Sequence, residues 1–263
     1  MYAFTYERPA TQADALKLAQ AGGKLLAGGQ TLLASMKLRL AAPDQVVDLG
    51  GIKELAGIRK EGNALVIGAM TRHCDVAESA EVRNAIPALA AMASNIGDKQ
   101  VRARGTIGGS VANNDPAADY PAALMALGAT VHTNARQIKA DDFFQGLFTT
   151  ALEEGELITA VSFPIPRKAA YMKFPQPASL FALIGVFVAQ TDAGVRVAVT
   201  GAGNGVFRHA GMEAALNANF APAAAAAVKT DAGEMSSDLH GSSAYRAHLV
   251  GVMTQRAVAK ALA

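Results

Sequence analysis

The sequence has little of the residue types that build disulfides and metal centres. It contains one cysteine, Cys74, in 263 residues, and no tryptophan. A single thiol cannot form an internal disulfide, and by itself it cannot ligate a zinc ion or an iron–sulfur cluster. The five histidines also lack the spacing of metal ligands. Any redox cofactor of this chain is therefore expected to be organic and non-covalently bound.

Charged residues and long apolar runs are scarce as well. The charges of the 24 Lys+Arg and 22 Asp+Glu nearly balance, and the sequence contains no run of basic residues that could bind along a nucleic-acid backbone. No apolar stretch reaches membrane-spanning length, and the first nine residues lack the basic and apolar regions of a secretory signal. We therefore expect a cytoplasmic chain that neither binds nucleic acid nor crosses a membrane.

Length and composition predict more than one domain. A chain of 263 residues exceeds the usual size of a single domain. The segment from Pro164 to Pro177 holds four prolines and three basic residues, which indicates a boundary. We predict a first domain over 1–168, with subdomains at about 1–56 and 57–168, and a second domain over 169–263.

Helix and strand signals are mixed along the whole chain. Thr11 begins a helix to Gln20, and a Gly/Asn turn joins two strands as a hairpin. The expected helices are 11–20, 32–39, 71–79, 85–95, 117–127, 209–216, 222–229 and 245–261, with another capped start at 141–144. The expected strands are 4–6, 24–27, 46–49, 55–60, 64–69, 130–132, 157–163, 181–190 and 195–200. This mixture predicts an α+β fold.

Glycine is plentiful, and two glycine pairs are each followed by a hydroxyl residue. The first pair, Gly28-Gly29, precedes Gln30-Thr31, and Thr31 is expected to cap the helix that follows. Free N–H groups and the dipole at a helix N-terminus favour an anion. A single glycine pair is most often only a tight turn, but two such pairs together favour a ligand site.

The second pair, Gly108-Gly109, lies within Gln100 to Asp119, which also carries two arginines and two acidic residues. We expect this stretch to be a binding loop rather than a regular helix or strand, with bare backbone N–H groups that curl around a phosphate. Neither pair fits a Rossmann or P-loop pattern, so a dinucleotide bound outside those folds is indicated.

Two roles are possible for each charged residue of this stretch. Arg102 and Arg104 either neutralise phosphate or make surface ion pairs. Asp115 and Asp119 fit a turn and a helix start better than a general acid and base, and Asp119 is expected to accept hydrogen bonds from a ribose or a flavin N–H.

The two glycine segments, in this order and spacing, resemble one family closely. The motifs are Ala27-Gly28-Gly29-Gln30-Thr31-Leu32-Leu33, Thr106-Ile107-Gly108-Gly109-Ser110 and Asp115-Pro116-Ala117-Ala118-Asp119. They are similar to the FAD-binding medium subunit of molybdenum hydroxylases of the carbon-monoxide-dehydrogenase and xanthine-dehydrogenase type, and the likeness runs nearly end to end. Two departures are Thr31, where many relatives carry Ser, and Phe181, where Tyr is frequent.

The resemblance implies a fold and a set of site residues. The fold is a two-subdomain FAD-binding unit of the PCMH type, followed by a lobe of three-stranded antiparallel sheet and helices. The cofactor-binding positions that it implies are Leu25, Leu26, Ala27, Gly28, Gly29, Gln30, Thr31, Leu32, Gly97, Thr106, Ile107, Gly108, Gly109, Ser110, Asp119, Ile158 and Lys173. No catalytic or metal-binding residue is expected on this chain.

The resemblance also implies partners. A large subunit would carry molybdopterin and a small subunit the 2Fe–2S clusters, assembled as a heterotrimer that commonly doubles. Electrons would pass from those clusters through FAD on this chain to a quinone, NAD or oxygen. A stand-alone FAD oxidase or dehydrogenase is the alternative, and a nucleotide-binding scaffold without redox activity is a third reading.

Overall fold

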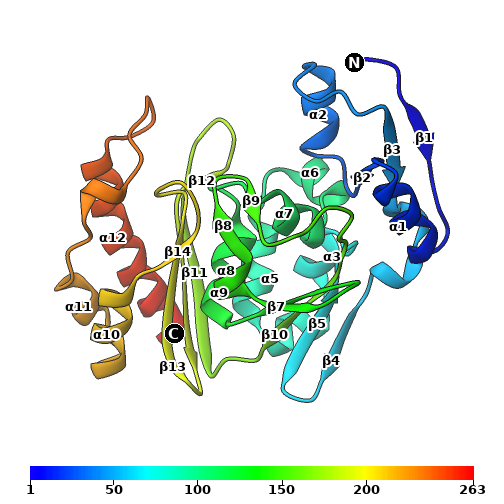
Figure 1. The fold of residues 1–263 in the computed structure, drawn as a ribbon. Helices are drawn as coiled ribbons and strands as arrows, with labels where there is room; N and C mark the ends of the chain where they lie inside the picture. The colour runs from blue at the N-terminus through cyan, green and yellow to red at the C-terminus, as the bar shows by residue number, and fades with distance from the viewer.

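A computed structural model describes all residues, 1–263, and divides them among several small sheets. The first part is a three-stranded parallel sheet in the order β1-β3-β2, with β1 at Thr5–Glu7, β2 at Lys24–Leu26 and β3 at Gln45–Asp48. Helices α1 (Gln12–Gln20) and α2 (Leu32–Lys37) connect the strands, and the short turns η1 (Leu49–Gly51) and η2 (Lys53–Leu55) lead out. Figure 1 shows this part at one side of the molecule, with α2 at its outer end.

The middle part is built on a five-stranded antiparallel sheet in the order β4-β5-β10-β6-β7. Its strands are β4 (Ile58–Glu61), β5 (Ala64–Gly68), β6 (Thr130–Thr133), β7 (Gln137–Lys139) and β10 (Ile158–Pro164), and a separate pair is β8 (Phe144–Gly146) and β9 (Thr149–Thr150). Its helices are α3 (His73–Glu78), α4 (Ala80–Ala85), α5 (Pro87–Ser94), α6 (Lys99–Arg104), α7 (Ile107–Asn113), α8 (Asp119–Leu127) and α9 (Ala140–Phe143).

The last part is an antiparallel sheet in the order β11-β12-β13-β14, covered by helices. The strands are β11 (Lys168–Pro175), β12 (Ala182–Thr191), β13 (Gly194–Thr200) and β14 (Phe207–Arg208), and the helical segments are α10 (Ala210–Ala218), α11 (Pro222–Ala226), η3 (Ala232–Glu234) and α12 (Ser243–Leu262). None of the helices combines the length and apolar character needed to cross a bilayer.

The C-terminal sheet lies between two cores. Val186, Val188 and Val197 on one face pack with α10 to α12. Phe187 and Ala198 on the other face join the core of the middle part, which includes α5 and α8. Because side chains alternate along a strand, the nearly continuous apolar run of β12 is explained by burial on both faces. Figure 1 shows the sheet between α12 and the middle part.

Hydrogen bonds tie the C-terminal sheet to the chain just ahead of α8. Thr200 in β13 is fully buried, and its hydroxyl lies 2.8 Å from the carbonyl oxygen of Pro116 and 2.7 Å from that of Ala118. The N–H of Gly201 also donates to the carbonyl oxygen of Pro116. These bonds fix the entry of α8 from a strand about 80 residues later in the sequence.

The mixed α+β architecture expected from the sequence is confirmed, and several details differ. The C-terminal sheet has a fourth strand, the two-residue β14, where three were expected. Helix α4 was not predicted; it begins because the hydroxyl of Ser79 caps it, accepting from the N–H of Val82. Strand β11 lies within the proline-rich segment, because its prolines fall before the strand and at or after its end.

We predict that Thr200→Val lowers the free energy of unfolding by about 1–3 kcal/mol, because a buried donor is lost and the carbonyl of Ala118 loses that partner. Urea unfolding of the full chain measures this change in the free energy of unfolding. The matched control is Thr254→Val, since the hydroxyl of Thr254 is equally buried but donates to a carbonyl of its own helix. Equal losses in the two variants would contradict the special role of Thr200.

Candidate functional site

The two glycine segments predicted from the sequence lie against each other. A Cβ added to Gly28 would overlap the carbonyl oxygen of Arg104 and lie 2.8 Å from the Cα of Gly105. A Cβ added to Gly109 would lie 3.3 Å from the Cβ of Ala27. The turn after β2 and the end of α6 therefore touch through backbone, which only glycine permits at position 28.

The turn after β2 offers free backbone donors. The N–H groups of residues 28 to 31 are four consecutive donors, and none of them donates to an acceptor in the protein. Gly29 has φ +74°, a left-handed conformation that glycine adopts without strain. Consecutive free N–H groups in such a turn form a concave anion site. The turn leads into α2, whose N-terminus adds positive potential.

The second glycine pair does not offer such donors, which corrects the nest expected at Gly108-Gly109. The N–H of Ile107 donates to the carbonyl oxygen of Thr71, and that of Gly108 to the carbonyl oxygen of Ala69. The N–H of Gly109 donates to the hydroxyl of Thr106. The donors of this segment are thus used to dock α7 onto the end of β5.

Gln100 to Asp119 is also more regular than the binding loop that we expected. It forms most of α6, then α7, a turn, and the first residue of α8. The carboxylate of Asp98 caps α6, and the hydroxyl of Thr106 caps α7. Asp115 accepts from the N–H of Ala117 in the turn, as its spacing indicated. By contrast, Thr31 makes no capping hydrogen bond to α2.

Arg102 and Arg104 lie on α6 and have different surroundings. The guanidinium of Arg102 donates to the carbonyl oxygens of Ile96 and Gly97, at 2.9 and 3.0 Å. Gly97 has φ +50°, and Arg102 holds this turn against α6. Arg104 is exposed, and no salt bridge engages it. Neither of the two roles considered for Arg102, phosphate neutralisation or an ion pair, accounts for these bonds.

A line of contacts continues from this turn to Asp119. The ammonium of Lys173 in β11 donates to the carbonyl oxygen of Asn95, 2.7 Å away, and lies 3.1 Å from the carboxylate of Asp119. It also donates to the carbonyl oxygen of Leu180. Lys173 and Asp119 therefore meet across 54 residues of sequence, next to the Gly97 turn.

Burial dominates the electrostatics of this pair. The side chains of Asp119 and Lys173 are only 5% and 8% exposed. Burial raises the pKa of Asp119, and the ammonium of Lys173 and the hydroxyl of Tyr171 oppose that rise. A buried carboxylate with two such donors is held in place, because leaving it unpaired would cost several kcal/mol.

A buried aromatic pair lies under the α6–α7 turn. A Cβ on Gly105 would lie 2.6 Å from the Nε2 atom of His73, and the His73 ring packs on Tyr120 with centroids 5.3 Å apart. Burial lowers the pKa of His73 to about 4. The imidazole is therefore neutral near pH 7 and brings no positive charge to the glycine turns.

Most of the predicted positions are thus brought together, with one exception. Residues 25–32, 97, 106–110, 119 and 173 follow one continuous line of contacts. Ile158 is 3% exposed, and its apolar side chain belongs to the core of the middle part. Its contact with a cofactor stays a prediction.

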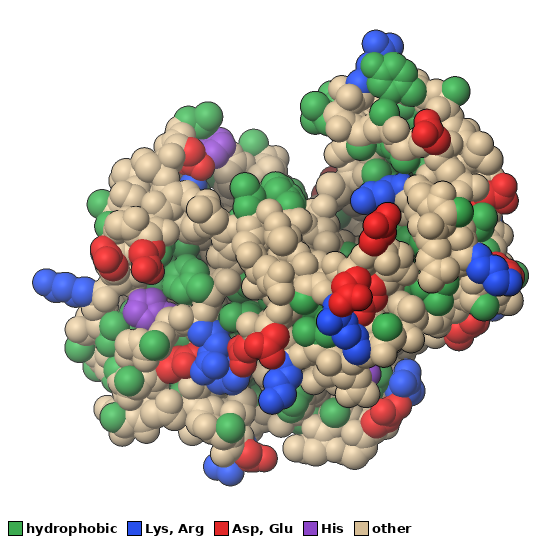
Figure 2. Space-filling view, viewed as in Figure 1, with side chains coloured by type: hydrophobic (Ala, Val, Ile, Leu, Met, Phe, Trp, Pro, Cys, Tyr) green, Lys and Arg blue, Asp and Glu red, His purple; other side chains and the backbone are tan.

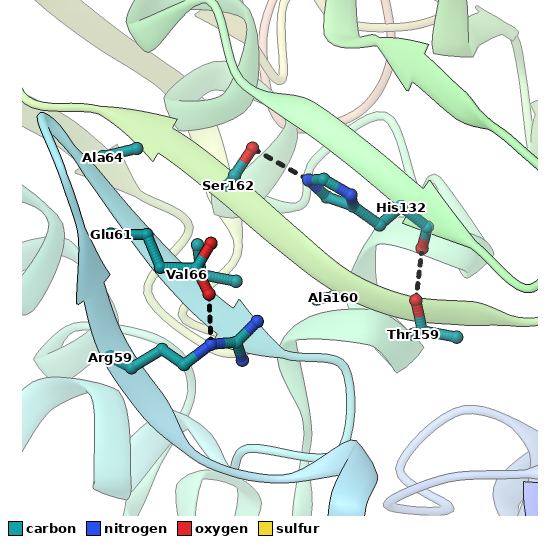
Figure 3. Close-up of a pocket in the computed structure, with 8 residues that line it drawn as sticks. All are labelled: Arg59, Glu61, Ala64, Val66, His132, Thr159, Ala160 and Ser162. Carbon is teal, nitrogen blue, oxygen red and sulfur yellow. Dashed lines mark hydrogen bonds and ion pairs between the residues drawn. The ribbon is translucent and has the colours of Figure 1, made fainter.

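The outer face of the five-stranded sheet carries a separate open groove of about 350 Å³ (Figure 3). His132 and Ser162 are hydrogen bonded there, and Arg59 pairs with Glu61. None of its lining residues belongs to the glycine segments, so it is not the predicted site. The space-filling view shows a different hollow, a notch between the part that carries α2 and the rest of the molecule (Figure 2).

The geometry fits a dinucleotide in one respect above all. A pyrophosphate needs several donors in a confined turn, and residues 28 to 31 supply them beside a helix N-terminus. A buried ion pair, Asp119 with Lys173, lies along the same line of contacts. This arrangement resembles neither a Rossmann turn nor a P-loop.

Comparisons with known proteins point to one family. A family model described as the FAD binding domain in molybdopterin dehydrogenase matches residues 2–166. The glyceraldehyde dehydrogenase medium chain of Sulfolobus acidocaldarius is 35% identical, covering 97% of this chain and 96% of that one. The carbon monoxide dehydrogenase medium chain of Afipia carboxidovorans is 37% identical, covering 99% and 97%.

Solved structures show the same likeness over the whole chain. Carbon monoxide dehydrogenase from Hydrogenophaga pseudoflava superposes with a TM-score of 0.91 at 36% identity, covering 99% of this chain and 98% of that one. Quinoline 2-oxidoreductase from Pseudomonas putida 86 gives 0.90 at 28% identity, covering 99% and 97%. The chain therefore belongs to the family of FAD-binding medium subunits of the molybdenum hydroxylases, which are oxidoreductases.

Proposed function

We propose that this chain is the electron-transfer subunit of a molybdenum hydroxylase and that it holds FAD along the line of contacts from Gly28 to Lys173. The observation that carries the proposal is the row of free N–H groups at residues 28 to 31, held against Arg104 and Gly105. When bound, FAD supplies the redox chemistry, by which electrons from partner clusters reach an external acceptor.

The residues of this chain bind and orient the cofactor. The turn at residues 28 to 31 receives the pyrophosphate, because its donors have no other partner. Helix α7 supports that turn from behind, since its own first donors are bonded to Ala69 and Thr71. The Gly97 turn, Asp119 and Lys173 are proposed to contact the remainder of the cofactor.

Partners are part of the proposal. Relatives carry names such as medium chain or medium subunit, and they serve complexes that act on different compounds, including glyceraldehyde, carbon monoxide and nicotine. We propose a large subunit with molybdopterin and a small subunit with 2Fe–2S clusters, in a dimer of heterotrimers. The substrate is then set by the large subunit, because this chain offers no cluster of metal-ligating side chains.

The first test is FAD binding by the apoprotein. Gly28→Ala is expected to weaken FAD binding on the order of 10- to 100-fold, because its Cβ would push the turn away from Arg104 and Gly105 and cost at least one phosphate hydrogen bond. Quenching of flavin fluorescence on titration measures the dissociation constant. Gly251→Ala is the control, since Gly251 lies in α12 with nothing near its added Cβ. Unchanged affinity in Gly28→Ala would remove the assigned role of this turn.

The second test separates a subunit from a stand-alone oxidase. The isolated chain loaded with FAD is expected to be reduced by dithionite but not by aldehydes, carbon monoxide or N-heterocycles, because the proposed molybdenum centre that oxidises them lies on a partner and no group of side chains that could hold a metal ion is found here. Visible spectra recorded with each compound and an artificial acceptor provide the measurement. Sustained substrate-dependent flavin reduction by the isolated chain would support the stand-alone enzyme instead.

A further inference from the structure

Tyr171 is a buried residue that the sequence did not mark as part of the site. It lies in β11, and its side chain belongs to the core that the C-terminal sheet shares with the middle part. Its hydroxyl donates to the Oδ1 atom of Asp119, 2.5 Å away and 52 residues earlier. Tyr171 and Asp119 are 6% and 5% exposed, so water does not replace this bond.

The neighbouring strand leaves room for this hydroxyl. Gly185 in β12 faces it, and a Cβ at Gly185 would overlap the Tyr171 hydroxyl and lie 2.8 Å from the Cγ2 atom of Thr200. The Tyr171 ring packs on Phe187, with ring centroids 6.0 Å apart. The hydroxyl makes no other hydrogen bond, so its placement serves Asp119 alone.

The other donor on Asp119 is the ammonium of Lys173. Its three protons have three acceptors: the Asp119 carboxylate, the carbonyl oxygen of Asn95 and that of Leu180. Asn95 lies two residues before Gly97, and Leu180, with φ +61°, comes just before the exposed Phe181. The ammonium thus joins the Gly97 turn to the loop between β11 and β12.

We propose that Tyr171 is a positioning residue of the flavin site. Its hydroxyl sets the rotation of the Asp119 carboxylate, and the carboxylate in turn holds Lys173 between Asn95 and Leu180. This inference rests on the proposed function, because the Gly97 turn, Asp119 and Lys173 are assigned there to FAD. Tyr171 itself acts through Asp119 and need not touch the cofactor.

The energetics favour a specific effect over a general loss of stability. Without the hydroxyl, the buried carboxylate keeps Lys173 as its only donor and gains freedom to rotate. The Tyr171 hydrogen bond also lowers the pKa of Asp119, so its loss favours the protonated acid. A protonated Asp119 would no longer pair with the ammonium, and the turn and loop would lose their common anchor.

The test is FAD titration of the full-length apoprotein carrying Tyr171→Phe. The Phe ring keeps the packing on Phe187, and the dissociation constant for FAD is expected to rise on the order of tenfold for one lost hydrogen bond to a charged group. Tyr120→Phe is the matched control: its hydroxyl is equally buried, on the residue next to Asp119, and has no partner. Affinity in this control should stay within about twofold of the unaltered chain.

A double-mutant cycle shows whether Tyr171 acts through Asp119. In an Asp119→Asn background, Tyr171→Phe is expected to cause little further loss of affinity, and losses that multiply would overturn the proposal. The visible absorption envelope of bound FAD should change in Tyr171→Phe and not in Tyr120→Phe.

FAD titration of the unaltered chain separates failure of the proposed function from failure of the role of Tyr171. If the unaltered chain binds no FAD, the proposed function is wrong and the inference falls with it. If the unaltered chain binds FAD and Tyr171→Phe binds it equally well with an unchanged spectrum, only the positioning role is overturned.

Discussion

The close approach of Gly28 to the backbone of Arg104 and Gly105 is the constraint on which the rest of the site depends. It joins the small parallel sheet to the helices of the middle part, with backbone against backbone and no side chain between. The turn is thereby held with its N–H groups turned away from protein acceptors. A side chain at position 28 would remove both features at once, because the space for a Cβ is already filled.

The two glycine segments are similar in sequence but have different roles in the structure. The first keeps its donors free, and the second uses them to dock on Ala69 and Thr71 at the end of β5. Gly108 also needs its lack of a side chain for packing, since a Cβ there would lie 2.5 Å from the Cβ of Ala69. One segment is therefore suited to bind a ligand, and the other to make the rigid support that such binding requires.

Much of this could be predicted from the sequence, and the limits have physical causes. Thr11, the hairpin at 58–68 and the Asp115 turn were predictable because caps and tight turns depend on neighbouring residues. The glycine pairs could be located but not told apart, because whether an N–H is free depends on partners such as Thr71 and Ala69, some 35–40 residues away. The helical state of Gln100 to Asp119 was missed, because its caps were masked by glycine-rich composition.

The candidate site, too, could be predicted only in part from the sequence. The resemblance to a family supplied Asp119 and Lys173, and the structure adds how they meet. Tyr171 gave no local signal: it is an aromatic residue in a buried strand, and only the packing of the C-terminal sheet on α8 places its hydroxyl on Asp119. Gly185 could have been noticed as a glycine inside an apolar strand, which often marks the close approach of another group.

The bonds from Thr200, Tyr171 and Lys173 also bear on where this protein can be divided. The family model ends at residue 166, yet the carbonyl of Ala118 and the carboxylate of Asp119 find their partners beyond that point. A fragment ending there would retain the glycine turns, but Asp119 would lose both of its donors and the apolar face of the middle part would be exposed to water. We therefore expect the two parts to unfold together, because each covers buried groups of the other.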